Sequence, residues 1–269
     1  MPSDSPAKQP ETWTRALENF RLLVASTTDW SVPTVCPGWS VADLVAHTID
    51  LEAMLATDPR PEHDPDWSQL PHVASDFARG MEVGVDYRRG RSKDELLEEL
   101  SLTHSRALTR LQALGPDASI PWLRGNTPIP RVLSMRTFDI WVHEQDVRVS
   151  TGNIGNLDGP GSVDAMRYLT AGLPKVWAKT VGAPIGSVLH VAIIGPGQTG
   201  DIWVGVNEDG KADFIESTLE ADVTVTLPWL TFVLLTAGRS VGPEVAESVV
   251  VAGDVELADS LIAGMAVTP

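Results

Sequence analysis

The stretch RTFDIWVHEQDVR, residues 136–148, places an acid, Asp139, and a histidine, His143, four residues apart. Four residues make about one helical turn, so on a helix the two side chains stand one above the other. A carboxylate and an imidazole at this spacing can bind one cation, or they can simply pair with each other. The choice between a cation site and a simple pair depends on whether a further ligand exists elsewhere in the chain.

A third candidate ligand, His47, lies in SVADLVAHTIDLEAMLA, residues 40–56. It falls on the apolar stripe of a predicted helix, in line with Leu44. A histidine at such a position can instead be a hydrogen-bonded core residue. A buried acid needs a partner, however, and helix bundles build metal sites from side chains on facing helices. We therefore predict that His47, Asp139 and His143 converge on a metal ion.

Two imidazoles and one carboxylate suit zinc with an open fourth position for water or a thiol. The same set suits non-haem iron, so the ligand types alone do not select the metal. Zinc with an open position lowers the pKa of a bound thiol and yields a thiolate at neutral pH. Asp146, three residues past His143, is either an acceptor that orients this histidine or a solvated acid near the helix end.

Other reactive side chains have simpler interpretations. His104 lies on the inward stripe of a predicted long helix, where we expect a hydrogen-bonded core histidine and keep a fourth metal ligand as the alternative. Cys36 has no histidine or basic residue near it in sequence to lower the pKa of its thiol, so we expect it to pack beside Trp39. His63 and His72 flank a proline-rich loop and lack the spacing of metal ligands. His190 stands alone in a predicted strand.

The first half of the chain predicts the helices that must position this site. Apolar residues recur with a helical period over about residues 11–27, 40–56, 92–114 and 131–150. Ser40 and Asp43 form a predicted capping pair, and a shorter helix is expected within residues 72–87. Four long amphipathic helices with irregular, proline-rich connections indicate a four-helix bundle.

The pattern changes after TGNIGNLDGPG. One helix is expected over residues 161–180, and an alternating pattern then predicts the strands VLHVAIIG, DIWVGV, ADFIES, ADVTVTL and ESVVVAG. PWLTFVLLTAG and VELADSLIAGM are the helices expected among them. The fold class predicted is α+β, with a helix bundle in residues 1–155 and a small α+β domain in residues 156–269.

Composition limits the partners. The chain has 269 residues, of which 43% are hydrophobic, and a net charge of −16, which disfavours nucleic acid and anionic membranes. The single cysteine excludes an internal disulfide framework and a multi-cysteine metal site, and it fits a reducing cytoplasm. No apolar run approaches the roughly 20 residues that span a bilayer, and we expect no secretory signal. We expect a cytoplasmic monomer or homodimer.

Two motifs, CPGWSVADLVAHTIDLE and RTFDIWVHEQDVR, together resemble the mycothiol-dependent maleylpyruvate isomerase family. The resemblance implies a DinB-like metal-binding four-helix bundle and, through LLTAGR and VVVAGDVELADSLI, a sterol-carrier-like second domain. It implies zinc held by His47, Asp139 and His143, with mycothiol, a thiol of actinobacteria, as the second cofactor. Family members with isomerase activity have glutamate where this chain has Asp139, whose side chain is one methylene shorter. Arg239, in TAGRS, matches an arginine that the family brings to the active site, although it can also be a surface arginine at a helix end.

The expected function is that of a zinc enzyme that activates mycothiol for addition to an electrophilic small molecule, as an isomerase or an S-transferase. The alternative is a non-catalytic protein that binds a metal or a hydrophobic ligand. A third possibility is a metal-free buried pair of Asp139 and His143, which leaves His47 unexplained. An open fourth coordination position favours the enzyme, and a fourth protein ligand favours a structural metal.

Overall fold

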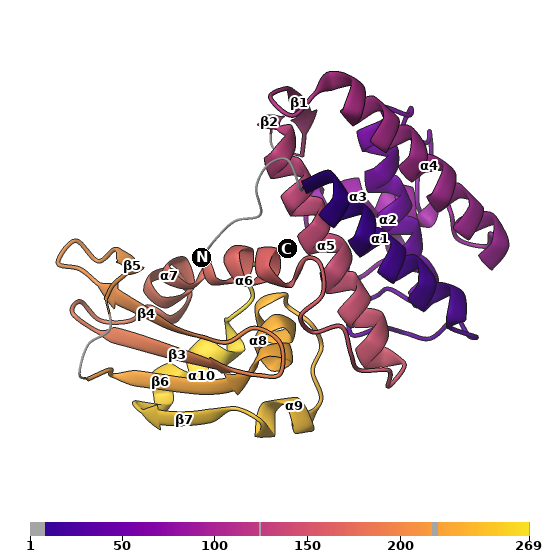
Figure 1. Ribbon diagram of the computed structural model, residues 1–269. Coiled ribbons are helices and arrows are strands. Elements are labelled where there is room, and N and C mark those ends of the chain that lie inside the picture. Colours follow the sequence, from indigo (N-terminus) through magenta and orange to yellow (C-terminus); the bar gives the residue numbers. More distant parts are fainter. Residues whose placement is uncertain (1–8, 124, 217–219, 269) are drawn as a thin grey trace. The chain divides into compact units, whose positions relative to one another are not determined.

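The structure, a computed structural model, describes residues 9–123, 125–216 and 220–268. The chain forms two compact units, Met1–Gly155 and Asn156–Pro269. Helices dominate the first unit, and the second combines helices with a five-stranded sheet (Figure 1). The α+β fold class is therefore confirmed.

Four long helices build the first unit, as the periodicity predicts: α1 (Gln9–Ser26), α2 (Val41–Ala56), α4 (Lys93–Leu114) and α5 (Ile129–Ser150). α2 lies against α4, and α1 lies against α5. The shorter α3 (Asp76–Asp86) packs on α2 and follows a 3-10 turn, η2 (Trp67–Gln69). Large side chains of the long helices fill the core and are fully buried, among them Trp13, Phe20, Leu44, Ile49 and Leu100.

Capping fixes where two of these helices begin. The Ser40 side chain accepts a hydrogen bond from the Asp43 backbone N–H, and the Asp43 carboxylate accepts one from the Ser40 N–H at 2.9 Å. Ser92 and Glu95 form the same capping box at the start of α4. Each box satisfies two backbone donors that a helix start leaves unpaired. The first of them sets the first turn of the helix that carries His47.

A hairpin connects α4 to α5 where the sequence predicts an irregular proline-rich segment. Its strands, β1 (Ser119–Trp122) and β2 (Gly125–Pro128), pair antiparallel. Ile120 and Trp122 alternate with exposed neighbours and join the core of the bundle. A two-stranded sheet has only edge strands, in which proline is tolerated, so the prolines do not exclude strands here.

The sheet of the second unit has the strand order β5-β4-β3-β6-β7. β3 and β6 are parallel, and the other neighbours are antiparallel. The strands coincide with the five alternating segments of the sequence: β3 (Val188–Ile194), β4 (Gly200–Val206), β5 (Ala212–Phe214), β6 (Val223–Pro228) and β7 (Val250–Gly253).

In the described residues of this unit, the helical segments are α6 (Ser162–Thr170), α7 (Leu173–Lys175), the π-helix η3 (Val176–Val181), α8 (Trp229–Thr236), α9 (Pro243–Glu247) and α10 (Val255–Ala263). The single helix expected over residues 161–180 is wrong. It breaks near Gly172, because Pro174 has no N–H to donate to a continuing helix. α9 was not anticipated. Within the described ranges, no helix is both long and apolar enough to cross a membrane.

Candidate metal centre

The structure brings the three predicted ligands together in the first unit. His47 comes from α2, and Asp139 and His143 come from successive turns of α5. The Oδ1 atom of Asp139 lies 3.7 Å from Nε2 of His47 and 3.6 Å from Nε2 of His143. One ligand atom from each of the three residues lies within 4.8 Å of the others.

These separations fit a shared cation better than direct pairing. Both contacts exceed the 2.7–3.2 Å of a good N–H···O hydrogen bond. Ligand atoms about 2.1 Å from a tetrahedral zinc ion lie about 3.4 Å from each other, which is close to what the donors show. The donor set of two imidazoles and one carboxylate therefore fits a divalent metal, whereas the simple Asp139–His143 pair is poorly bonded.

Burial differs among the ligands in a way that leaves one side open. The side chains of His47 and His143 are 6% and 7% exposed, whereas 27% of the Asp139 side chain is exposed. A metal held here has its two imidazoles inside the bundle and its carboxylate toward the accessible side.

The protonation states also suit metal binding. Burial lowers the pKa of His47 and thereby favours the neutral imidazole, which is the form that binds a metal. Burial acts in the opposite direction on Asp139, but the charges of His143 and Arg136 outweigh it and hold the pKa of this carboxyl well below its usual range. Neither ligand has to lose a proton at neutral pH before a cation binds.

The metal-free protein is expected to lose stability as the pH falls below about 6.5, the ordinary pKa of histidine. Its unfolded chain then binds a proton at position 47 that the folded chain does not bind. The free energy of unfolding falls by up to about 1.4 kcal/mol per pH unit for this one proton. Urea unfolding in chelator, at several pH values between about 7.5 and 5.5, should show a flatter slope for His47→Gln. Identical slopes in the two proteins would contradict the lowered pKa.

Asp146 orients His143. Its Oδ2 atom lies 2.9 Å from Nδ1 of His143, and the residue is fully buried. This contact holds the ring with Nε2 toward Asp139 and favours the tautomer whose Nε2 carries the lone pair. The predicted contact with His143 is confirmed, and the alternative of a solvated acid is wrong.

The CPGW turn forms one wall of the site. The ring of Trp39 lies 4.9 Å from that of His47 and 6.1 Å from that of His143, measured between centroids. Its Nε1 donates to buried Glu82 of α3 at 2.8 Å. Gly38 has a φ of +79°, and a Cβ there would lie 2.3 Å from the ring of His72. The turn therefore requires glycine at this position.

Gly38→Ala is expected to destabilise the protein more than Gly90→Ala does. Both glycines have positive φ, +79° and +84°, but a Cβ at Gly90 meets nothing within 4 Å. Each substitution carries a backbone strain of about 1–3 kcal/mol, and only the first adds the clash with His72. Chemical unfolding of the two variants should separate these contributions. If the two variants lose the same free energy of unfolding, the turn accommodates the Cβ beside His72 without an energetic cost, which would contradict the prediction.

Cys36 has a closer relation to the site than its sequence neighbours indicate. It belongs to the buried core against which Trp39 packs, as expected. Its sulfur also lies within 4.8 Å of ligand atoms of His143 and Asp146. No histidine is near Cys36 in sequence, but the fold brings His143 close to it. The loop is fixed to the end of α5 by a hydrogen bond from Val35 N–H to the Ser150 hydroxyl at 3.0 Å, a contact between residues 115 positions apart.

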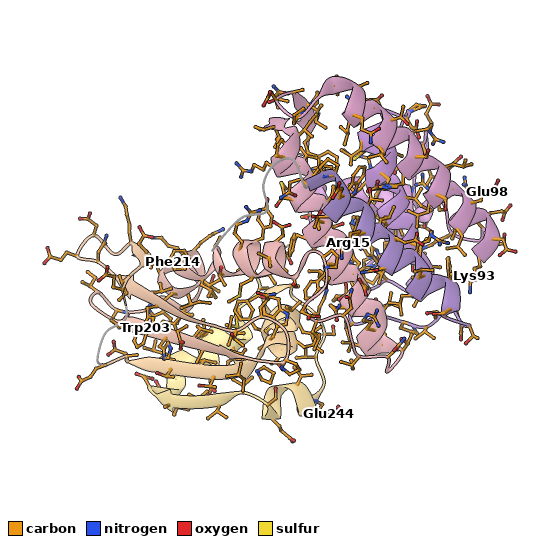
Figure 2. The ribbon with its side chains drawn as sticks, in the orientation of Figure 1. Arg15, Lys93, Glu98, Trp203, Phe214 and Glu244 are labelled. Atoms are coloured by element: carbon orange, nitrogen blue, oxygen red, sulfur yellow. The ribbon has the colours of Figure 1, made fainter. Side chains whose placement is uncertain are left out.

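The other histidines all have polar partners. His104 is a hydrogen-bonded core residue, as predicted, because its Nδ1 lies 3.0 Å from Glu52 and its Nε2 lies 3.3 Å from the Thr14 hydroxyl. Trp203 of the second unit is labelled in Figure 2. His190 of β3 stacks on this residue of the neighbouring strand β4, with ring centroids 4.0 Å apart, and contacts Asp201 of β4. The remaining two pair with acids, His63 with Asp86 and His72 with Glu82.

Arg239 lies in the second unit, just after α8, and is partly buried. Its Nη1 donates to the carbonyl of Ala237 at 2.8 Å. A role for its guanidinium in catalysis stays a prediction.

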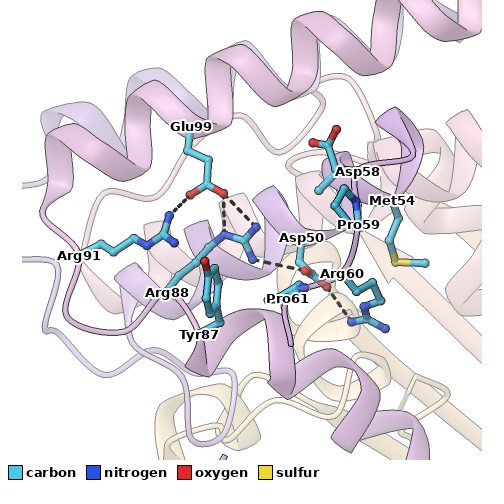
Figure 3. A pocket seen from close by; sticks show the side chains of 11 residues that line it. Asp50, Met54, Asp58, Pro59, Arg60, Pro61, Tyr87, Arg88, Arg91 and Glu99 are labelled. Carbon is cyan, nitrogen blue, oxygen red and sulfur yellow. Dashed lines mark hydrogen bonds and ion pairs between the residues drawn. The ribbon is translucent and has the colours of Figure 1, made fainter. Parts of the chain in front are cut away.

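A cavity of about 270 Å³ in the first unit contains none of the three candidate ligands. Figure 3 shows Arg88 at its centre, between Glu99 of α4 and Asp50 of α2. Arg60 also bonds to Asp50, and Arg91 bonds to Glu99. Each of these arginines faces an acid, so the cavity wall is an ion-pair network that ties α2, α3 and α4 together.

The first unit matches the family model described as the mycothiol maleylpyruvate isomerase N-terminal domain, over residues 13–148. The chain also resembles the crystal structure of the mycothiol-dependent maleylpyruvate isomerase, with 17% identity, a TM-score of 0.57, and 93% of this chain and 95% of that chain covered. A histidine-to-alanine mutant of that isomerase matches over the same shares, with 16% identity and a TM-score of 0.58. At these identities the likeness establishes the fold. No curated protein matches the sequence significantly.

Proposed function

The chain belongs to the mycothiol maleylpyruvate isomerase family, and we propose on this basis that it is a zinc-dependent enzyme that activates mycothiol. The thiol would add to an electrophilic small molecule, with an isomerase or an S-transferase outcome. The observation that carries the proposal is the convergence of His47, Asp139 and His143 around a common centre with one exposed side.

The chain's own residues have distinct roles in this proposal. His47 and His143 would bind zinc through Nε2, and Asp146 keeps the His143 ring in the required orientation. Zinc at this position would lower the pKa of a thiol that reaches the open side, so that a thiolate is available near neutral pH. Asp139 would be the third ligand, and its partial exposure supports access for the thiol.

His104 supports an open fourth position. Both of its ring nitrogens are engaged, by Glu52 and by Thr14, so this histidine is not directed at the candidate centre. The described ligand group has three members, the number typical of catalytic zinc sites. A structural zinc site usually has four protein ligands. The geometry thus favours the enzyme over the non-catalytic alternative.

Two outcomes follow from thiol addition. As an isomerase, the sulfur adds to one carbon of an activated double bond, the resulting single bond rotates, and the sulfur leaves, so that the thiol is regenerated. As a transferase, the new carbon–sulfur bond remains. Arg239 is the proposed catalytic arginine, whose guanidinium would bind a carboxylate of the substrate or of the thiol.

The test is a thiol assay on zinc-loaded protein with mycothiol and an electrophile, either a cis-enedione or a simple alkylating agent. We expect acceleration over the free thiol, which a chelator abolishes and added zinc restores. Isomerisation without net thiol loss identifies an isomerase, and equal consumption of thiol and electrophile identifies a transferase. Zinc-loaded protein that accelerates neither reaction would contradict the proposal.

A further inference from the structure

A buried carboxylate, Glu52 of α2, lies where the four long helices meet. It is fully buried, and each of the other three helices supplies a partner to it. Nε1 of Trp13 in α1 donates to its Oε1 at 3.1 Å, and Nδ1 of His104 in α4 lies 3.0 Å from its Oε2. Nη2 of Arg136 in α5 donates to Oε1 at 3.0 Å. Burying an ionised carboxylate is costly unless it is paired and hydrogen-bonded, and these contacts meet that condition.

Arg136 links this centre to the candidate metal site. Only 1% of the residue is exposed, and a guanidinium does not lose its proton in a protein. It therefore needs counter-charges, and it has two, Glu52 on one side and Asp139 on the other. Its Nη1 donates to Oδ2 of Asp139 at 2.5 Å. The path from Glu52 through Arg136 to Asp139 thus consists of charge-assisted hydrogen bonds within the bundle.

The two oxygens of Asp139 consequently have different surroundings. Oδ2 is engaged by Arg136, whereas Oδ1 faces Nε2 of His47 and Nε2 of His143. A carboxylate can bind a cation through one oxygen or through both. With Oδ2 engaged, only Oδ1 is directed at the centre between the imidazoles.

We infer that Arg136, held by Glu52, is a positioning residue that restricts Asp139 to one metal-binding oxygen and so keeps a coordination position open for the thiol. This inference rests on the proposed metal site. Without the guanidinium, both oxygens could turn to the metal and occupy the open position.

A second buried ion pair on α5 provides a matched control. Arg148 bonds to Glu144 at 2.8 Å, and Glu144 is fully buried, like Glu52. Arg148 lies five residues beyond His143, whereas Arg136 lies three residues before Asp139. Loss of either pair removes a fully buried glutamate and an arginine of α5. Only loss of the Arg136 pair should alter the metal site.

The test compares Glu52→Gln/Arg136→Met with Glu144→Gln/Arg148→Met, so that neither double variant leaves an unpaired buried charge. The full-length proteins are titrated with Co²⁺, visible spectra are recorded, and thermal unfolding of the metal-free forms checks folding. We expect the first double variant to bind Co²⁺ about 10–100-fold more weakly. Its visible bands should lose intensity, as happens when cobalt gains a ligand. The control should keep the wild-type affinity and spectrum.

Arg136→Lys extends the test in case the first double variant does not fold. Lysine keeps the positive charge, but its single ammonium cannot bind Glu52 and Asp139 at once as the planar guanidinium does. The loss of intensity in the cobalt bands should therefore also occur in this variant, which we expect to fold. Wild-type affinity and spectrum in Arg136→Lys, or equal behaviour of the two double variants, would overturn the inference and leave the proposed metal site intact. Wild-type protein that binds no Co²⁺ would instead overturn the proposed function.

Discussion

Alanine in place of His47 or His143 is expected to abolish tight zinc binding. Zinc sites with four ligands bind with about 10–16 kcal/mol, or roughly 3 kcal/mol per ligand. Loss of one imidazole should therefore weaken binding on the order of 100-fold or more. Competition with a chromophoric chelator measures this change directly.

His63→Ala is the matched control for these two variants. His63 is a partly buried histidine of the same unit and bonds to Asp86 at 2.7 Å, outside both candidate ligand groups. Its removal should leave zinc affinity unchanged. If His47→Ala and His143→Ala also keep wild-type affinity, the metal does not bind where we propose.

Asp146→Asn should weaken zinc binding by about 10–100-fold, although residue 146 does not touch the metal in our account. The amide cannot hold the His143 ring as an ionised acceptor does, so the tautomer with Nε2 free is less favoured. The same chelator competition gives the affinity, and Asp86→Asn is the control, because that acid bonds to His63. Affinity that is equal in the two variants would show that the contact of 2.9 Å with His143 is only structural.

Most of the candidate site could be predicted because its geometry is largely local. A four-residue spacing on one helix fixes Asp139 relative to His143 before any tertiary contact is known. The apolar period of α2 then places His47 on the inward side. Two amphipathic helices of one bundle can bury their stripes only against each other or their neighbours, which brings these residues together.

The parts that could not be predicted depend on contacts between distant residues. In the sequence, nothing distinguishes Glu52 from the other acids on predicted helices, because its partner Arg136 is 84 residues away. Cys36 approaches His143 only because a loop with its own turn chemistry is fixed to the end of α5. Periodicity identifies a buried face, but it does not identify which buried charges pair across the core.

The most direct test of the central claim is zinc-edge X-ray absorption of the purified protein, before and after addition of mycothiol. We expect two imidazole nitrogens, oxygen donors and no sulfur around the zinc before the thiol is added, and one new sulfur neighbour once it is present. Sulfur in the protein without thiol would contradict it, because the metal would then bind at Cys36, His143 and Asp146. An unchanged spectrum after saturation with thiol would contradict thiol activation at this site.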